Sequence, residues 1–163
     1  MPFELLLWRL SLADWAAYRG RDASLRQRSP IGTLHSVHYD AELIRAWGQL
    51  PDGFFAHRLV LCHPRLVVAV GPRAAVGSLC FRAPDAAAGT VEVGYGIAPA
   101  WRGRGYATEA LRLALNELPI NFTRIIAHTA ADNLASQRVL KRNGFTQTHR
   151  DEDFGILTFE RVR

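Results

Sequence analysis

The sequence has little cysteine, no long apolar run and no internal repeat, and each absence removes a class of protein. Its two cysteines, Cys62 and Cys80, lie in apolar stretches, so we expect small buried side chains rather than a disulfide or a metal site. No apolar run approaches the roughly 18 residues of a membrane span, and Glu4 and Arg9 interrupt the apolar start, unlike a signal peptide. We therefore expect a soluble cytoplasmic protein without a bound metal.

The composition is that of a globular protein with a modest positive charge. The 163 residues are 48% hydrophobic and 21% charged, which predicts a single domain, 1–163, with a sizeable core. The net charge of +5 favours anionic partners. Basic residues are scattered and no zinc-finger, leucine-zipper or aromatic RNA-binding pattern is present, so nucleic acid is not the expected partner. A basic nucleic-acid-binding domain stays open as an alternative, and strongly salt-dependent binding would reveal it.

Hydrophobic periodicity predicts a mixed α/β fold whose strands are mostly joined by hairpins. The predicted strands are residues 3–10, 65–70, 74–83, 90–98, 122–129, 145–149 and 155–162. The predicted helices are residues 12–19, 41–50, 106–118 and 134–142, each preceded by a capping residue or a glycine. Residues 21–39 are polar and irregular. Gly94 and Gly96 inside a strand indicate a bulge or the close approach of a ligand.

A charged, glycine-rich turn stands directly before the third predicted helix. In Arg102 to Gly105, two arginines and two glycines occupy four residues. A helix start leaves backbone N–H groups without partners and carries partial positive charge, so glycines there allow an anion to approach. The dinucleotide fingerprint lacks its third glycine, and the phosphate-binding loop lacks its Gly-Lys-Ser/Thr triplet. Two interpretations remain, a phosphate site and a plain turn before a core helix.

Two blocks of sequence resemble the GNAT family of N-acetyltransferases. Ile97-x-Pro99-x-x-Arg102-Gly103-x-Gly105-x-Ala107 resembles its acyl-CoA motif, and "DNLASQRVLKRNGF", 132–145, is similar to its later helix. The second block and "VEVGYGIAP", 91–99, resemble the RimJ/RimL-like branch. The resemblance implies a central, mostly antiparallel sheet that is splayed in the middle and flanked by helices. It is strong from about residue 91 to residue 145 and thin over the first 60 residues.

The resemblance also implies where acetyl-CoA, the co-substrate, binds. Its pantetheine arm would pair with the backbone near Ile97 and Ala98, and Asn133 would bond to it, although Asn133 also reads as a helix cap. Its pyrophosphate would lie on the turn and the helix start. The implied residues there are Arg102, Gly103, Arg104, Gly105, Tyr106, Ala107 and Thr108.

Acetyl transfer requires a neutral amine and a stabilised leaving thiolate. Glu92, on the strand leading into the site, is the candidate base, with His128 as the alternative because histidine is the side chain that ordinarily changes charge near neutral pH. The family's usual tyrosine acid falls on Leu140, which cannot donate a proton. In the RimJ/RimL-like branch a serine takes over, and Ser136 matches it. Each residue also has a structural interpretation: an exposed strand charge, a structural histidine, or a first-turn serine bonding the backbone.

We therefore expect an acetyl-CoA-dependent N-acetyltransferase acting on a primary amine. The amine could be a protein N-terminus, an amino acid, a small amine or an antibiotic, and a homodimer is compatible with this reading. The alternative is a non-catalytic acyl-CoA-binding module, which would bind without turnover. Several aromatic residues could line the acceptor pocket or belong to the core: Trp15, Tyr18, Trp47, Phe54 and Phe55.

Overall fold

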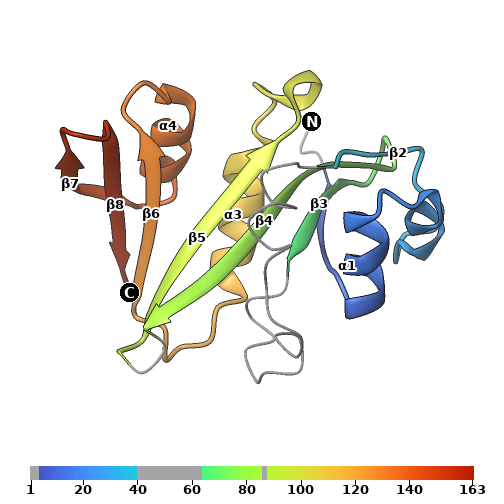
Figure 1. Cartoon of the computed structure of the whole chain (residues 1–163), viewed down its shortest axis with the longest axis horizontal. Helices are drawn as coiled ribbons and strands as arrows, with labels where there is room; N and C mark the ends of the chain where they lie inside the picture. The colour runs from blue at the N-terminus through green and yellow to red at the C-terminus, as the bar shows by residue number, and fades with distance from the viewer. Residues whose placement is uncertain (1–3, 40–63, 86–87) are drawn as a thin grey trace.

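The computed structural model describes residues 4–39, 64–85 and 88–163, which form one sheet with helices on both faces (Figure 1). The strands are β1 (Leu5–Arg9), β2 (Ser36–Val37), β3 (Arg65–Ala69), β4 (Ala74–Asp85), β5 (Thr90–Ile97), β6 (Arg124–Ala130), β7 (Thr146–Asp151) and β8 (Ile156–Val162). The α-helices are α1 (Leu12–Arg19), α3 (Tyr106–Asn116) and α4 (Leu134–Arg142), and two short 3₁₀ helices are η1 (Ala23–Arg28) and η4 (Pro99–Trp101).

The strands follow the order β1-β3-β4-β5-β6-β8-β7, and the short β2 pairs with β4. Within the described ranges, only β5–β6 and β2–β4 run parallel, and every other pair is antiparallel. The expected fold, a mixed α/β structure with a mostly antiparallel sheet, is confirmed.

Two hydrophobic clusters hold the helices to the sheet. On one face, Leu111 and Leu115 of α3 and Leu140 of α4 are buried against Val91 and Val93 of β5. The other face carries a separate cluster that includes α1. Figure 1 shows α3 behind β4 and β5 and α1 in front of the sheet. The spacing of apolar residues in α3 explains its orientation, because buried positions three to four residues apart share one side of a helix.

The sheet splits between β5 and β6. These strands pair only over residues 90–92 and 124–126, the last pair being Glu92 with Ile126. Beyond that point β5 keeps its pairing with β4 to the pair Gly77–Ile97, and β6 stays paired with β8 along its whole length. The two strands diverge toward the top of Figure 1 and leave a V-shaped opening in the ribbon. The splay expected in the middle of the sheet is therefore present.

The structure corrects three details of the sequence analysis. Residues 21–39 contain η1 and β2, because Asp22 caps the first turn of η1 through the Ser24 N–H. The strand predicted at 74–83 is longer than expected, since β4 continues through Pro84 to Asp85. The prediction of a bulge at Gly94 and Gly96 is wrong for the pairing with β4, because the register between β4 and β5 passes both glycines without a shift.

Several expectations lie outside the described residues. They concern the predicted helix at 41–50, Cys62, Trp47, Phe54 and Phe55. Trp15 and Tyr18, which were alternatives for the acceptor pocket, are buried in the cluster that includes α1. Among the residues described, no helix is both long and apolar enough to cross a membrane.

Gly77 fixes how closely β4 and β5 approach beside the opening. A Cβ atom added to Gly77 would collide with the Gly96 carbonyl oxygen and would lie 2.7 Å from Ile97 Cδ1. We predict that Gly77→Ala lowers the free energy of unfolding by about 1–3 kcal/mol, the usual cost of overpacking. Urea denaturation measures it. Gly71→Ala is the control, because a Cβ there meets nothing within 4 Å. Equal stability of the two variants would contradict the prediction.

Candidate active site

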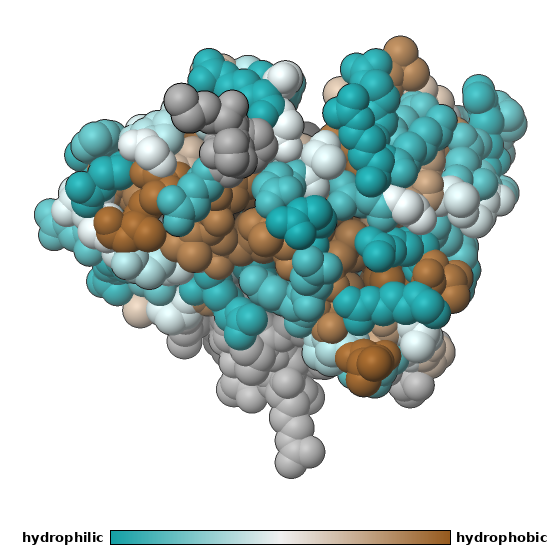
Figure 2. Space-filling view, turned by 180° about the vertical axis from the view of Figure 1, so that it is seen from behind, coloured by the Kyte–Doolittle hydropathy of each residue, from teal (hydrophilic) through white to brown (hydrophobic). Residues whose placement is uncertain are grey.

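A pocket of about 430 Å³ lies at the open end of the splay, between the start of α3 and the start of α4. From behind, Figure 2 shows a notch there between two raised, mostly hydrophilic parts of the surface. The lining residues are Tyr95, Gly96, Ile97, Trp101, Arg102, Gly103, Gly105, Tyr106, Ala107, Thr108, Asn133, Ala135, Ser136, Arg138, Val139 and Arg142. The pocket therefore joins the two sequence blocks that carry the family resemblance.

The start of α3 presents backbone donors to this pocket. Gly105 is the N-cap, with φ 85°, and it supplies no side-chain hydrogen bond to the first turn. Since the first N–H groups of a helix have no intrahelical acceptor, those of Ala107 and Thr108 remain available to an anion. Gly103 is also left-handed, with φ 75°, and a Cβ there would meet nothing within 4 Å. The space around Gly103 is therefore open, and it adjoins the pocket that Gly103 lines.

The two arginines of the turn have structural partners. Arg102 Nε donates to the Ile97 carbonyl oxygen at 2.9 Å, which ties the turn to the end of β5. The Arg104 guanidinium lies over the Trp101 ring, 5.1 Å from its centroid, and does not line the pocket. Ala98 is buried and also lies outside the lining, and its N–H donates to the Val76 carbonyl oxygen of β4.

The start of α4 forms the opposite wall. Asn133 is the N-cap, and its Oδ1 accepts a hydrogen bond from the Ser136 N–H at 3.1 Å. The cap interpretation of Asn133 is therefore confirmed, while its side-chain NH₂ has no hydrogen bond to any described residue. Ser136 lies in the first turn, where the helix dipole favours negative charge.

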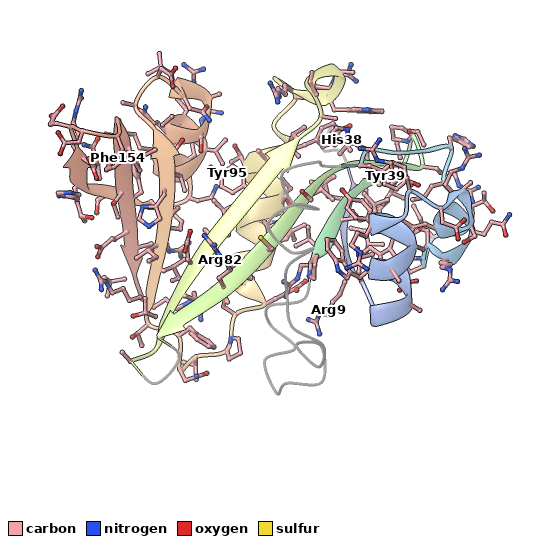
Figure 3. All side chains as sticks on the ribbon, in the orientation of Figure 1. Arg9, His38, Tyr39, Arg82, Tyr95 and Phe154 are labelled. Atoms are coloured by element: carbon pink, nitrogen blue, oxygen red, sulfur yellow. The ribbon has the colours of Figure 1, made fainter. Side chains whose placement is uncertain are left out.

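Tyr95 connects the two sides of the opening. It projects from β5 toward α4 (Figure 3), and its Oη lies 3.0 Å from Ser136 Oγ and 3.3 Å from the Ser136 carbonyl oxygen. Burial raises the pKa of Tyr95 to about 12, and the hydrogen bond with Ser136 opposes part of that rise. Tyr95 is therefore a neutral hydrogen-bonding group at any ordinary pH.

The pocket is electrostatically one-sided. Arg102, Arg138 and Arg142 line it, two helix starts face it, and no lining residue within the described ranges is acidic. Both helix dipoles and guanidinium groups stabilise anions. The chemistry of the lining fits a phosphorylated ligand.

The two candidate bases lie outside this lining. Glu92 is on β5, but Val91, Val93 and Tyr95 face α3 and α4, and alternation along a strand places Glu92 on the opposite face. There its carboxylate contacts Arg82 of β4 at 2.6 Å (Figure 3 labels Arg82). His128 of β6 is exposed, and its Nδ1 lies 3.2 Å from Thr158 Oγ1.

Glu92 nevertheless lies beside the opening between β5 and β6. It belongs to the last pair before β5 and β6 separate, so it lies where the V narrows to a point. His128 follows Ile126, the β6 residue of that pair, by two positions. Both candidate bases therefore border the opening from the face opposite α3 and α4.

Sequence reasoning missed six lining residues, Tyr95, Trp101, Ala135, Arg138, Val139 and Arg142. A signal for three of them was present. Tyr95 precedes Ile97 by two residues on the same strand, so the two side chains share a face, and Ile97 is a predicted site residue. Val139 follows Ser136 by three residues and Arg142 follows Val139 by three, and residues three apart are neighbours on a helix surface.

The comparisons with known proteins agree with this geometry. A family model described as an acetyltransferase (GNAT) domain matches residues 4–146. Among curated proteins, none matches the sequence. The chain is similar to the ribosomal-protein-S5-alanine acetyltransferase from Vibrio fischeri, with a TM-score of 0.68 and 17% identity over 99% of this chain and 95% of that chain.

Two further solved structures are similar over nearly the whole chain. The ribosomal L7/L12 α-N-protein acetyltransferase RimL, in complex with coenzyme A, gives a TM-score of 0.68 and 18% identity, covering 99% of this chain and 96% of that one. A mutant of the spermidine N-acetyltransferase SpeG from Vibrio cholerae gives 0.65 and 16% identity, covering 97% and 93%. At such identities these structures establish a shared fold.

Proposed function

Because this chain belongs to the GNAT acetyltransferase family, an enzyme family that uses acetyl-CoA, we propose that it acetylates a primary amine as a member of the RimJ/RimL-like branch. The observation that carries this proposal is the pocket in which the α3 start, the α4 start and three arginines meet, with no acidic residue among the described lining residues. We further propose that residues 1–163 form one acetyltransferase domain acting in the cytoplasm on a small-molecule or peptide amine.

The proposed acetyl-CoA site follows the two walls of the pocket. The pyrophosphate would be held by the turn and first helical residues that line the pocket, Arg102, Gly103, Gly105, Tyr106, Ala107 and Thr108. Arg104, whose guanidinium lies over Trp101, would support the turn and add positive charge beside it. The pantetheine amides would be bound by the β5 backbone at Ile97, with Ala98 supporting that strand end, and by the Asn133 side-chain NH₂. Arg138 and Arg142 add charge on the α4 side. Acetyl-CoA supplies an activated acetyl thioester, and the protein's residues position it and stabilise charge.

A side chain at Gly105 should disrupt this site. Gly105 is left-handed at the N-cap of α3, so Gly105→Val strains the turn and places two methyl groups where the backbone must face the phosphates. We predict at least a tenfold weaker affinity for coenzyme A, an estimate of about 1.4 kcal/mol or more, measured by calorimetry. Gly155→Val is the matched control, because Gly155 is also left-handed, with φ 62° and open space around it, outside the pocket lining. Unchanged affinity in Gly105→Val would contradict the assignment.

We propose that Ser136 stabilises the thiolate of coenzyme A as it departs. It lines the pocket in the first turn of α4, and the position of the family's tyrosine acid is taken by Leu140, which is fully buried. A hydroxyl hydrogen bond to a charged group contributes roughly 1.5–3 kcal/mol. We predict that Ser136→Ala lowers kcat by about ten- to a hundredfold with little change in KM for acetyl-CoA, because the interaction grows as charge reaches sulfur. Steady-state kinetics giving a raised KM at constant kcat would refute this role.

We propose that Glu92, directly or through water, receives the proton of the amine. A primary α-amine has a pKa of about 7.7–8.0, so a base is needed most at low pH. Since a general base typically supplies about a hundredfold or more, Glu92→Gln should lower kcat strongly near pH 6.5 and progressively less toward about pH 9.

The control is Glu160→Gln, which removes another arginine-paired strand carboxylate, held by Arg124 at 2.6 Å; it should keep the wild-type pH profile. His128→Gln separates the two candidate bases. If His128→Gln and not Glu92→Gln changes the acidic limb of the profile, then His128 is the base.

The acceptor is identified by thiol release from acetyl-CoA with a panel of amines. The panel contains peptides with free and with blocked N-termini, amino acids, polyamines and aminoglycosides. Release that depends on a free peptide N-terminus supports the RimJ/RimL-like assignment. Release with polyamines alone would reject that branch, and release with no amine would contradict the acetyltransferase activity.

A further inference from the structure

The contact between Tyr95 and Ser136 has a consequence for catalysis that the family resemblance does not contain. We propose that Tyr95 is a positioning residue: its hydroxyl donates a hydrogen bond to Ser136 Oγ and so directs the hydroxyl hydrogen of Ser136 toward the departing sulfur. This inference rests on the proposed function, in which Ser136 stabilises the thiolate of coenzyme A.

The geometry limits which hydrogen bonds the pair can make. Tyr95 has one hydroxyl hydrogen and two neighbours, Ser136 Oγ at 3.0 Å and the Ser136 carbonyl oxygen at 3.3 Å. The carbonyl oxygen can only accept, whereas each hydroxyl can donate one hydrogen bond and accept others. The single Tyr95 hydrogen therefore allows two arrangements. In one, Tyr95 donates to the carbonyl and Ser136 donates to Tyr95. In the other, Tyr95 donates to Ser136 Oγ and the Ser136 hydrogen is released into the pocket.

The second arrangement is favoured when negative charge develops on sulfur. The 3.0 Å contact falls within the ordinary range for O–H···O hydrogen bonds and the 3.3 Å contact falls beyond it. A hydroxyl that accepts a hydrogen bond also becomes a better donor, because hydrogen bonds in a chain polarise one another. Tyr95 therefore both orients Ser136 and strengthens it as a donor.

The Tyr95 hydroxyl keeps its proton during the reaction. Burial raises the pKa of Tyr95 to about 12, and an ordinary thiol ionises near 8.5. Transfer of a proton from this phenol to a thiolate is therefore unfavourable by roughly three orders of magnitude. As the C–N bond forms, the C–S bond breaks and its electron pair remains on sulfur. The amine proton goes to the base, and solvent protonates the thiolate.

Tyr95 holds this position because both neighbouring elements are fixed. On β5 it pairs with Leu79 of β4, and its ring contacts the buried cluster beneath α3. On α4, the Ser136 N–H is held by the Asn133 cap. The family's usual donor, a tyrosine at position 140, is absent, and the phenol instead comes from the adjacent strand.

The test is a double-mutant cycle on the full chain. Tyr95→Phe keeps the ring and removes the hydroxyl; kcat should fall about three- to tenfold, as expected for one hydrogen bond, with unchanged KM for acetyl-CoA. In the Ser136→Ala background, Tyr95→Phe should cause no further loss, because the residue through which it acts is gone. Tyr39→Phe is the matched control. Its hydroxyl donates to the Asp22 carbonyl oxygen, away from the pocket, so kcat should stay at the wild-type value.

Placing 3-fluorotyrosine at position 95 provides a second variant should Tyr95→Phe fold poorly. It keeps the hydroxyl and makes it a stronger donor, so kcat should be maintained or raised; a fall would overturn the proposal. Unchanged kcat in Tyr95→Phe, an equal loss in both backgrounds, or a loss confined to KM would each overturn it as well. These results leave acetyl transfer intact, whereas a wild-type protein that releases no thiol with any amine would defeat the proposed function itself.

Discussion

The short ladder between β5 and β6 is the constraint on which the rest of the site depends. Three residue pairs hold the two halves of the sheet together, and the strands separate after Glu92 and Ile126. Each strand stays paired on its other side, so the split removes ladder hydrogen bonds only from the two edges that face each other. The backbone groups that remain along that edge of β5 need partners. An extended ligand with amide groups can supply them.

The two helices turn this opening into a charged pocket. α3 and α4 both begin at the wide end of the V, so their positive ends face one volume, and arginines from the turn and from α4 add to the field. The arginines and glycines of the turn have different structural roles. Arg102 is bonded to the Ile97 carbonyl and so fixes the turn against the strand. The glycines at 103 and 105 then give the turn its left-handed shape, which other residues adopt only with strain.

Most of the fold could be predicted from the sequence because its signals are local. Alternation of apolar residues predicts the strand before Arg102–Gly105, and the glycines and Pro119 mark where the helix after it begins and ends. The second block contains the residue that caps its own helix. What could not be predicted depends on contacts between distant segments. Tyr95 and Ser136 are 41 residues apart, and nothing near either residue in the sequence indicates that their hydroxyls meet.

The alternation of side chains along β5 explains why Tyr95 lines the pocket and Glu92 does not. Glu92 and Tyr95 are both on β5 near the opening, yet an odd separation along a strand places side chains on opposite faces. Counting positions from Tyr95 would have placed Glu92 away from the pocket and Tyr95 inside it. The actual twist and divergence of β5 and β6 are needed to see that Glu92 still borders the opening from the other face.

Asn143 determines which part of the pocket can change its width. Its side chain is buried and Nδ2 donates to the Thr108 carbonyl oxygen at 3.2 Å, so the end of α4 is fastened to the first turn of α3. The Asn143 carbonyl oxygen in turn accepts from Arg161 of β8 at 3.0 Å. The end of α4 and the first turn of α3 are thus held together beside the turn Arg102–Gly105. We therefore expect any widening of the pocket at the start of α4, where Ser136 meets Tyr95 of β5.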